Sequence, residues 1–331
     1  MPSFLDLPRE LRDKILSLAI SAPIPAPESH SATGDGDRVE LSNTEFTGYA
    51  KHDGVKYRKQ MNRTIFIPTL LVNRQLHEET LTAIARLSTK HTYILDIMLV
   101  DGYFLWPTWL SVPTLSSMVD KVHTSIRNDH TSKRVYSGFA GGSGGPPIVV
   151  WPLLGILDRF LRVGPVVNPA AKAHGTMAIG VLELDVITPE VAENLFIPHE
   201  GCWDTLRKHG WSENESDVKY IIPASYLVAF LEEHLDRLLS MGGEHSDYGR
   251  LLIERIGTVR LMLDGVLYHE WNMAQVLACV RFSESFSSYP GFSRGNLAKF
   301  KEWKLEAYQI RAQLGLPTIP SQDGTPTDNV A

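Results

Sequence analysis

Five consecutive residues of this chain match a pattern used in nucleophilic catalysis. Residues 141–145 read Gly-Gly-Ser-Gly-Gly, which fits the G-x-S-x-G turn that holds a reactive serine between a buried strand and a helix. Here a weakly patterned segment precedes Ser143, and Pro146 and Pro147 follow it, so the strand–turn–helix context is missing. We therefore interpret residues 137–147 as a glycine-rich, flexible surface loop and expect no catalytic role for Ser143.

Two groups of histidines resemble metal-binding patterns without completing them. His77-Glu78-Glu79 begins like the zinc motif H-E-x-x-H, but Leu81 stands where the second histidine is required. His199, Cys202 and His209 offer three ligands, whereas structural zinc takes four and usually includes neighbouring cysteines. The sequence therefore predicts no metal site, no cofactor and no catalytic residue, although a site assembled only in space leaves no trace of this kind.

The composition is that of a water-soluble globular protein. The chain has 331 residues, of which 43% are hydrophobic and 21% charged, and its formal net charge is −6. This charge gives no general attraction to nucleic acid or to anionic lipid, so we expect neither as a partner. Charged residues interrupt the apolar N-terminal stretch, which excludes a signal peptide, and apolar runs such as 148–157 are too short to span a bilayer. Two cysteines suit a reducing compartment, and we expect a cytoplasmic or nuclear protein.

The first helix is the stretch that suggests a function. Pro8 suits a first helical turn, and the prolines at 23, 25 and 27 predict that the helix ends near Ser21. One apolar stripe follows the helical spacing, and Leu16 and Ile20 lie beside it and widen the apolar surface. We expect this surface to pack on the chain itself or on a partner. The stripe consists of Leu7, Leu11, Ile15 and Leu18.

A second amphipathic helix is predicted from Pro68 to about Leu87. Its apolar residues share one face, which is the natural partner of the first helix. Together the two helices would form a small head, residues 1–90, interrupted by a long insertion at 22–67. The residues predicted to face inward are Val72, Leu76, Ala83, Ile84 and Leu87.

These two stretches carry a resemblance to a known family. Leu7-Pro8-x-Glu10-Leu11 with Ile15-Leu16, and later the run at 70–79, resemble the F-box, and more closely the F-box-like domains common in fungal proteins. An F-box docks on the Skp1 adaptor of a cullin ubiquitin ligase, while the rest of the chain captures a substrate. The resemblance implies that an Skp1-like adaptor is contacted by Leu7, Pro8, Glu10, Leu11, Ile15 and Leu16.

The rest of the chain alternates between strand and helix patterns. Apolar alternation predicts strands near 93–100, 122–127, 182–186 and 259–264. Helical stretches are predicted at 148–163, 220–241, 267–282 and 297–314, the last with Phe300, Trp303, Ala307, Ile310 and Leu314 facing inward. Strands separated by helices indicate an α/β (mixed α+β) body at 91–314 with a central sheet and crossover helices, followed by a disordered tail at 315–331.

Three interpretations of function follow from these observations. The first is a non-enzymatic protein-interaction adaptor, the substrate-recruiting subunit of an Skp1–cullin–F-box-type ubiquitin ligase. The second is an enzyme whose site lies in the α/β body, and the third is an F-box-like orphan protein that binds no ligase. Coverage of the first helix separates the first interpretation from the third, because a stripe buried by the chain itself leaves no room for an adaptor.

Overall fold

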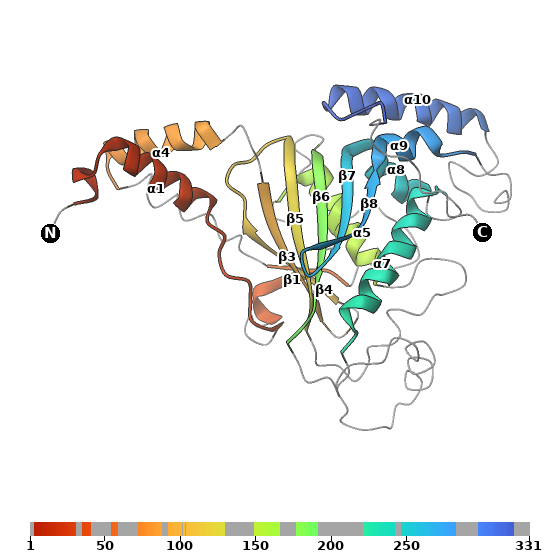
Figure 1. Cartoon of the computed structure of the whole chain (residues 1–331), viewed down its shortest axis with the longest axis horizontal. Helices are drawn as coiled ribbons and strands as arrows, with labels where there is room; N and C mark the ends of the chain where they lie inside the picture. Colours follow the sequence, from red (N-terminus) through yellow and green to blue (C-terminus); the bar gives the residue numbers. More distant parts are fainter. Residues whose placement is uncertain are drawn as a thin grey trace, which may run out of the picture.

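The computed structural model shows a mixed α+β protein built around one six-stranded sheet (Figure 1). It describes residues 3–30, 35–40, 54–58, 72–87, 92–100, 102, 104–129, 149–165, 177–190, 221–241, 246–282 and 297–320. The helices are η1 (Phe4–Asp6), α1 (Arg9–Ser21), η2 (Asp35–Asp37), α4 (Arg74–Leu87), α5 (Val150–Val163), α7 (Ala224–Leu239), α8 (Ser246–Arg255), α9 (Met273–Cys279) and α10 (Leu297–Gln313). The strands are β1 (Arg38–Glu40), β2 (Lys56–Arg58), β3 (Thr92–Val100), β4 (Phe104–Ser111), β5 (Met118–Asp129), β6 (Ala178–Ile187), β7 (Ile256–Leu263) and β8 (Val266–Asn272).

The sheet has the order β4-β3-β5-β6-β7-β8. The four inner strands β3, β5, β6 and β7 are parallel, and an antiparallel hairpin closes each end through β4 and β8. Successive parallel strands are neighbours, and each step moves in the same direction across the sheet. Right-handed crossovers that all step in one direction place their helices on one face. The helices α7, α8 and α9 accordingly lie to the right of the sheet in Figure 1, while α1 and α4 lie to the left.

The main hydrophobic core lies between this helical layer and the sheet. Alternate residues of each inner strand, such as Leu95, Val122, Leu184 and Leu261, belong to one buried cluster with residues of α5, α7, α8 and α9. The opposite face carries a small separate cluster around Trp106 and a band of charged side chains. The predicted strands and the central sheet with crossover helices are therefore confirmed.

Several elements of the body differ from the expectation, among them the helix α8, which the sequence analysis did not predict. The predicted helix at 267–282 is wrong: Val266–Asn272 forms the edge strand β8, and only Met273–Cys279 is helical. Asp264 and Gly265 both have positive φ, which suits the tight turn that joins β7 to β8. The sequence analysis also overlooked β4, whose Pro107 is tolerated because β4 is at the edge of the sheet.

The last helix has its predicted extent but a different inward face. Phe300, Trp303 and Ala307 are buried as expected, and the next buried position of α10 is Arg311, which is 0% exposed. Ile310 and Leu314, predicted to face inward, are half-buried. Of the predicted tail, residues 321–331 lie outside the described residues.

The helices α1 and α4 pack against each other and form, with η1, a unit that we call the head (Figure 1). α1 ends at Ser21 as predicted. The second helix starts at Arg74 rather than Pro68: Asn73 precedes it and accepts a hydrogen bond from the Leu76 N–H at 2.8 Å. Val72 lies outside the helix and is 62% exposed, so its predicted inward position is wrong. None of the helices in the described ranges has the length and apolarity to cross a membrane.

Candidate protein-interaction site on the helical head

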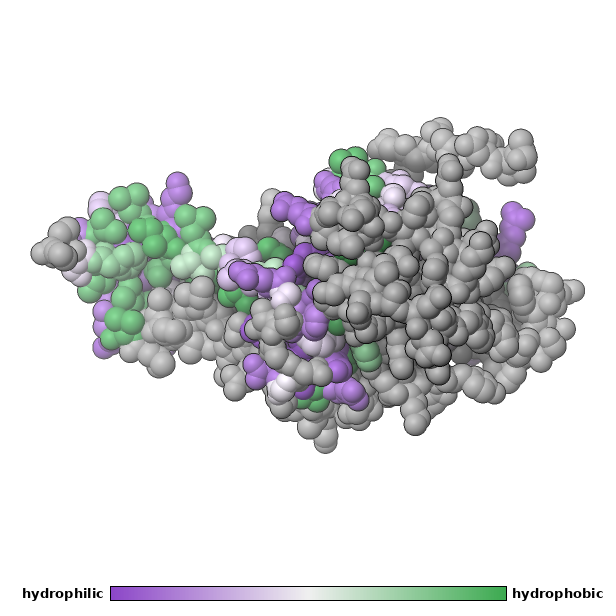
Figure 2. Space-filling model, turned by 90° about the horizontal axis from the view of Figure 1, so that it is seen from below, coloured by the Kyte–Doolittle hydropathy of each residue, from purple (hydrophilic) through white to green (hydrophobic). Residues whose placement is uncertain are grey.

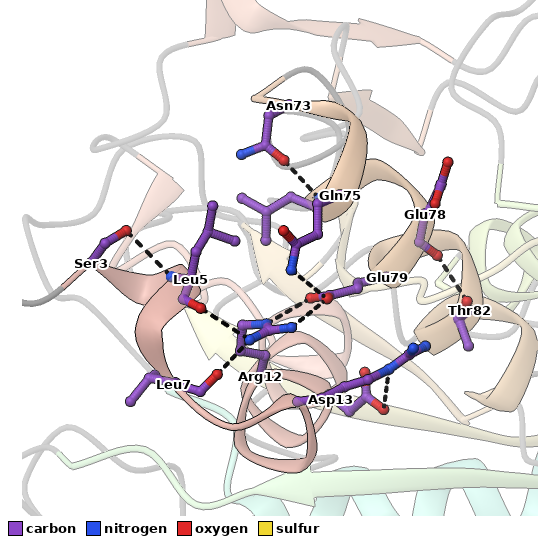
Figure 3. Close-up of polar contacts among 12 residues, drawn as sticks. Ser3, Leu5, Leu7, Arg12, Asp13, Asn73, Gln75, Glu78, Glu79 and Thr82 are labelled. Atoms are coloured by element: carbon purple, nitrogen blue, oxygen red, sulfur yellow. Dashed lines mark hydrogen bonds and ion pairs between the residues drawn. The ribbon is translucent and has the colours of Figure 1, made fainter.

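A buried arginine–glutamate pair joins the two helices of the head (Figure 3). Nε of Arg12 donates to Oε2 of Glu79 at 2.9 Å, and Nη2 donates to Oε1 at 2.6 Å. The second terminal nitrogen, Nη1, donates to the carbonyls of Leu5, at 3.2 Å, and Leu7. One side chain of α1 therefore holds α4 and the turn that precedes α1 in a single arrangement, which suits the planar fork of a guanidinium.

This pair shifts the protonation equilibrium of both partners. The hydrogen bonds from Arg12 lower the pKa of Glu79 to about 2, against the opposing effect of burial, and Gln75 adds a further hydrogen bond to the same carboxylate. The hydrogen bond to Glu79 raises the pKa of Arg12 in turn. Both groups remain charged at neutral pH, so the pair is a structural fixture rather than a proton-transfer centre.

The apolar contact between the helices lies beside this pair. Leu16 is 4% exposed and Ile20 1% exposed, and both pack with Ala83 of α4. With Arg12 they recur every four residues, so one side of α1 faces α4. At the edge of the contact, Asp13 accepts a hydrogen bond from Arg86 at 2.6 Å. The packing side of α1 is therefore Arg12, Leu16 and Ile20, and not the stripe predicted from the sequence.

Three of the four residues of the predicted stripe lie on the side of α1 away from α4 and are exposed to solvent. Leu11 is 49% exposed, Ile15 43% and Leu18 62%. Leu18 lies about 200° around the helix from Leu16, on the opposite side. Figure 2 shows apolar residues gathered over the head, at the left of the view. Because large apolar side chains in one exposed row mark an interaction surface, these three residues form the candidate site.

The structure divides the predicted contact residues into two groups. Leu11 and Ile15 belong to the exposed row, and Pro8 and Glu10 are exposed at the beginning of the same helix. Leu16 does not belong with them, because it fills the contact with α4; its predicted role as an exposed contact is wrong. Leu7 is half-buried, and its carbonyl accepts a hydrogen bond from Arg12.

The turn before α1 is fixed by its own polar contacts. The side chain of Ser3 accepts a hydrogen bond from the Leu5 N–H at 3.3 Å, and Asp6 accepts one from the Ser3 N–H at 2.6 Å. This reciprocal pattern is a capping box, with Ser3 as the N-cap that begins the short helix η1. Pro8 then starts α1, as a proline suits a position without a backbone donor.

A second cluster of charged groups lies on the sheet face opposite the described body helices. Glu183 accepts hydrogen bonds from Lys121 at 2.6 Å and from His123 at 3.1 Å, and Arg260 lies 3.7 Å away. Burial raises the pKa of Glu183, but the hydrogen bonds from Lys121 and His123 outweigh it, and the net shift is downward. Arg260 is itself paired with Glu270 at 2.5 Å. These mutual pairs account for the charges of the cluster, which forms an ion-pair network across the four strands β5 to β8.

The chemical motifs considered from the sequence do not converge on a site. Ser143, His199, Cys202 and His209 lie outside the described residues. Glu79, from the incomplete zinc motif, is the partner of Arg12 in the head. In the part of the chain that the structure describes, no group of three or more His, Cys, Asp or Glu side chains is placed to hold a metal ion.

Arg12 and Glu79 were missed as key residues because both are charged. The sequence analysis placed charged residues on the wet side of each helix, which is the usual arrangement. One feature of the sequence could have identified Arg12. It stands four residues before Leu16 and eight before Ile20, so it lies on the same side of the helix as these packing residues. Comparisons of this chain with protein-family models, with curated proteins and with solved structures found no match.

Proposed function

We propose that this protein is a non-enzymatic interaction adaptor whose head binds a partner protein through the exposed row Leu11, Ile15 and Leu18. The partner that fits the resemblance of the head is an Skp1-like adaptor of a cullin-type ubiquitin ligase. The body would then present a client to the ligase. The observation that carries this proposal is a helix with apolar residues on two opposite sides, of which only one is covered by its own chain.

The energetics of α1 support a partner on its open side. A surface helix of a globular protein has one apolar face, whereas a helix that is apolar on both sides usually lies between two neighbours. Leu11, Ile15 and Leu18 recur at spacings of four and three, which aligns them as the seam of a helix–helix contact. Burying such a side chain is worth about 2 kcal/mol, so three anchors suffice for a specific contact.

The long segment between α1 and α4 leaves this surface open where it is described. Residues 22–30 run along the sheet, where Ile24 donates its N–H to the Leu110 carbonyl at 2.9 Å. β1 and β2 pair with each other, and Gly54 accepts a hydrogen bond from the Leu105 N–H at 2.7 Å. These described parts of the insertion therefore pack on the body and not on the exposed row of α1.

The test combines binding with stability in matched variants. The wild-type protein is titrated with a purified Skp1-like adaptor by isothermal calorimetry, and binding is expected. Leu11→Asp and Leu18→Asp are expected to abolish binding and to leave the melting temperature within a few degrees, since both side chains are exposed. Leu305→Asp changes an equally exposed leucine on α10 and is expected to bind like the wild type.

Two outcomes contradict the proposal. One is a wild-type protein that shows no heat of binding at high micromolar adaptor, which leaves the orphan interaction protein as the remaining interpretation. The other is normal binding by both aspartate variants, which places the contact elsewhere on the chain. Leu16→Asp serves as the stability control, because a carboxylate at this buried position is expected to unfold the head.

A further inference from the structure

The last residue of α1 and the nine residues after it are tied to the sheet at four successive points. The hydroxyl of Ser111 donates to the Ser21 carbonyl at 3.2 Å, and the Leu110 carbonyl accepts the Ile24 N–H at 2.9 Å. Further along, Arg127 donates through Nη2 to the Pro27 carbonyl at 2.7 Å. The segment, residues 22–30, therefore crosses from the edge strand β4 to the inner strand β5.

The last tie is made by His30. Its N–H donates to Oδ2 of Asp129, and its Nδ1 lies 3.0 Å from the same oxygen. Its ring meets the ring of Trp106 edge-on, with centroids 5.9 Å apart. Both partners belong to the sheet face opposite the body helices that the structure describes, so the segment lies over the carboxyl end of that face.

The anchor in the middle of the segment is itself rigid. Arg127 forms a two-point ion pair with Asp96, at 2.6 and 2.9 Å, and the carboxylate of Asp96 is 1% exposed. A guanidinium locked in this way presents its remaining N–H groups in a fixed direction. The segment adds stiffness of its own, since the prolines at 23, 25 and 27 fix three φ angles.

We propose that residues 22–30 act as a rigid strap that fixes the direction in which the head projects from the sheet, with Arg127 and Asp129 as its anchors. Figure 1 shows the head extending to the left of the sheet, at the end of this segment. A flexible linker of this length would have a root-mean-square end-to-end distance of roughly 16 Å and no fixed direction. The strap removes that freedom, so the exposed row of α1 keeps one orientation relative to the body.

The test measures the spread of distances between head and body in the full chain. Spin labels are placed at Lys14→Cys on α1 and Glu306→Cys on α10, both exposed, after Cys202→Ser and Cys279→Ser remove the native thiols. Pulsed electron–electron double resonance then gives the distribution of distances between the two spin labels. The parent protein is expected to give one narrow peak, because the strap holds the head in place.

The variants release the strap at each anchor. Asp96→Leu with Arg127→Leu removes the middle anchor without leaving a buried charge unpaired. Asp129→Ala removes the far tie, because this carboxylate accepts both the N–H and the ring contact of His30. The double variant is expected to broaden the distribution at least about twofold, as for a released linker. The control, Arg260→Leu with Glu270→Leu, removes an ion pair from the same sheet and is expected to keep the parental width.

Two results overturn the strap. A parent distribution that is already broad shows that the head is not fixed, whatever the variants do. A narrow parent distribution that both release variants retain shows that the head is held by something else. Should the double variant fail to fold, Asp129→Ala decides alone, because Asp129 is the last residue of β5 and does not belong to the hydrophobic core. None of these readouts needs a bound partner, so the outcome is independent of the adaptor proposal.

Discussion

Arg12 and Glu79, 67 positions apart in the sequence, meet through two hydrogen bonds in the contact between α1 and α4. Each side chain is less than a tenth exposed, so the pair is shielded from the solvent that weakens surface ion pairs. Removing one partner leaves the other charge buried and alone, whereas removing both leaves two apolar stems in contact. The position of α1 in the head therefore depends on its pairing with Glu79 as well as on the packing of its own leucines.

This pairing predicts a strongly coupled double-mutant cycle. Arg12→Leu and Glu79→Leu are each expected to destabilise the head, and the double variant is expected to recover part of that loss. Hydrogen exchange of the α1 amides provides the readout. The control cycle uses Arg74 and Glu78, an exposed pair on α4, where the coupling is expected to be only about 0.3 kcal/mol. Additive losses at Arg12 and Glu79 would contradict the prediction.

The low pKa of Glu79 predicts how the stability of the head depends on pH. Its folded pKa is about 2 and its ordinary value is 4.5, so the stabilisation is complete above pH 4.5. It is lost as the pH falls from 4.5 towards 2, since protons then bind the unfolded state first. Urea unfolding at stepped pH is expected to show a shallower decline in this window for Arg12→Leu with Glu79→Leu than for the wild type. Equal declines would rule the pair out as the source.

The two sides of α1 predict opposite effects for two leucines that are two positions apart. Leu16→Ala removes a buried side chain and is expected to cost about 2–5 kcal/mol of folding free energy. Leu18→Ala removes an exposed one and is expected to change it by less than about 0.5 kcal/mol. Urea denaturation of both variants checks the difference, and a larger loss for Leu18→Ala would reverse the assigned orientation of α1.

Arg311 predicts a further stability effect, in the body. Its side chain donates to the carbonyls of Ile253, Ile256 and Pro317, and no carboxylate in the described residues pairs with it. Burial accordingly lowers its pKa to about 10. Arg311→Met would leave these buried carbonyls without donors and is expected to cost about 3 kcal/mol. Lys304→Met, which removes a half-exposed donor from α10, is expected to cost clearly less in the same thermal unfolding measurement.

The periodicity of the sequence was enough to place α1 and the inner strands, but not to orient α1. Leucine and isoleucine occupy both sides of this helix, so spacing alone cannot say which side packs. The apolar spacing selected Leu7, Leu11, Ile15 and Leu18 as the main stripe and placed Leu16 beside it. Only the carboxylate that α4 supplies makes burial of Arg12 favourable, and that contact spans 67 residues.

The edge strand β8 was not predicted, for a different reason. The apolar run from Leu267 to Phe282 satisfies a helical pattern, and it hides a strand of seven residues followed by a short helix. The turn residues Asp264 and Gly265 carried the missing signal, since Asp-Gly between apolar runs is typical of a two-residue hairpin turn. In β4 a proline concealed the strand, and only the position at the sheet edge explains why it is tolerated.

Because α7, α8 and α9 lie on one face of the sheet, the strand residues on its two faces are under different constraints. Strand residues under these helices, such as Leu184 and Leu261, are constrained by close packing, where a change of one methylene is felt. Half-exposed residues between them, such as Lys121, Ser125 and Thr258, touch the solvent and leave no cavity when they change. The sheet thus offers a surface whose chemistry can diversify among related chains while the fold beneath it stays the same.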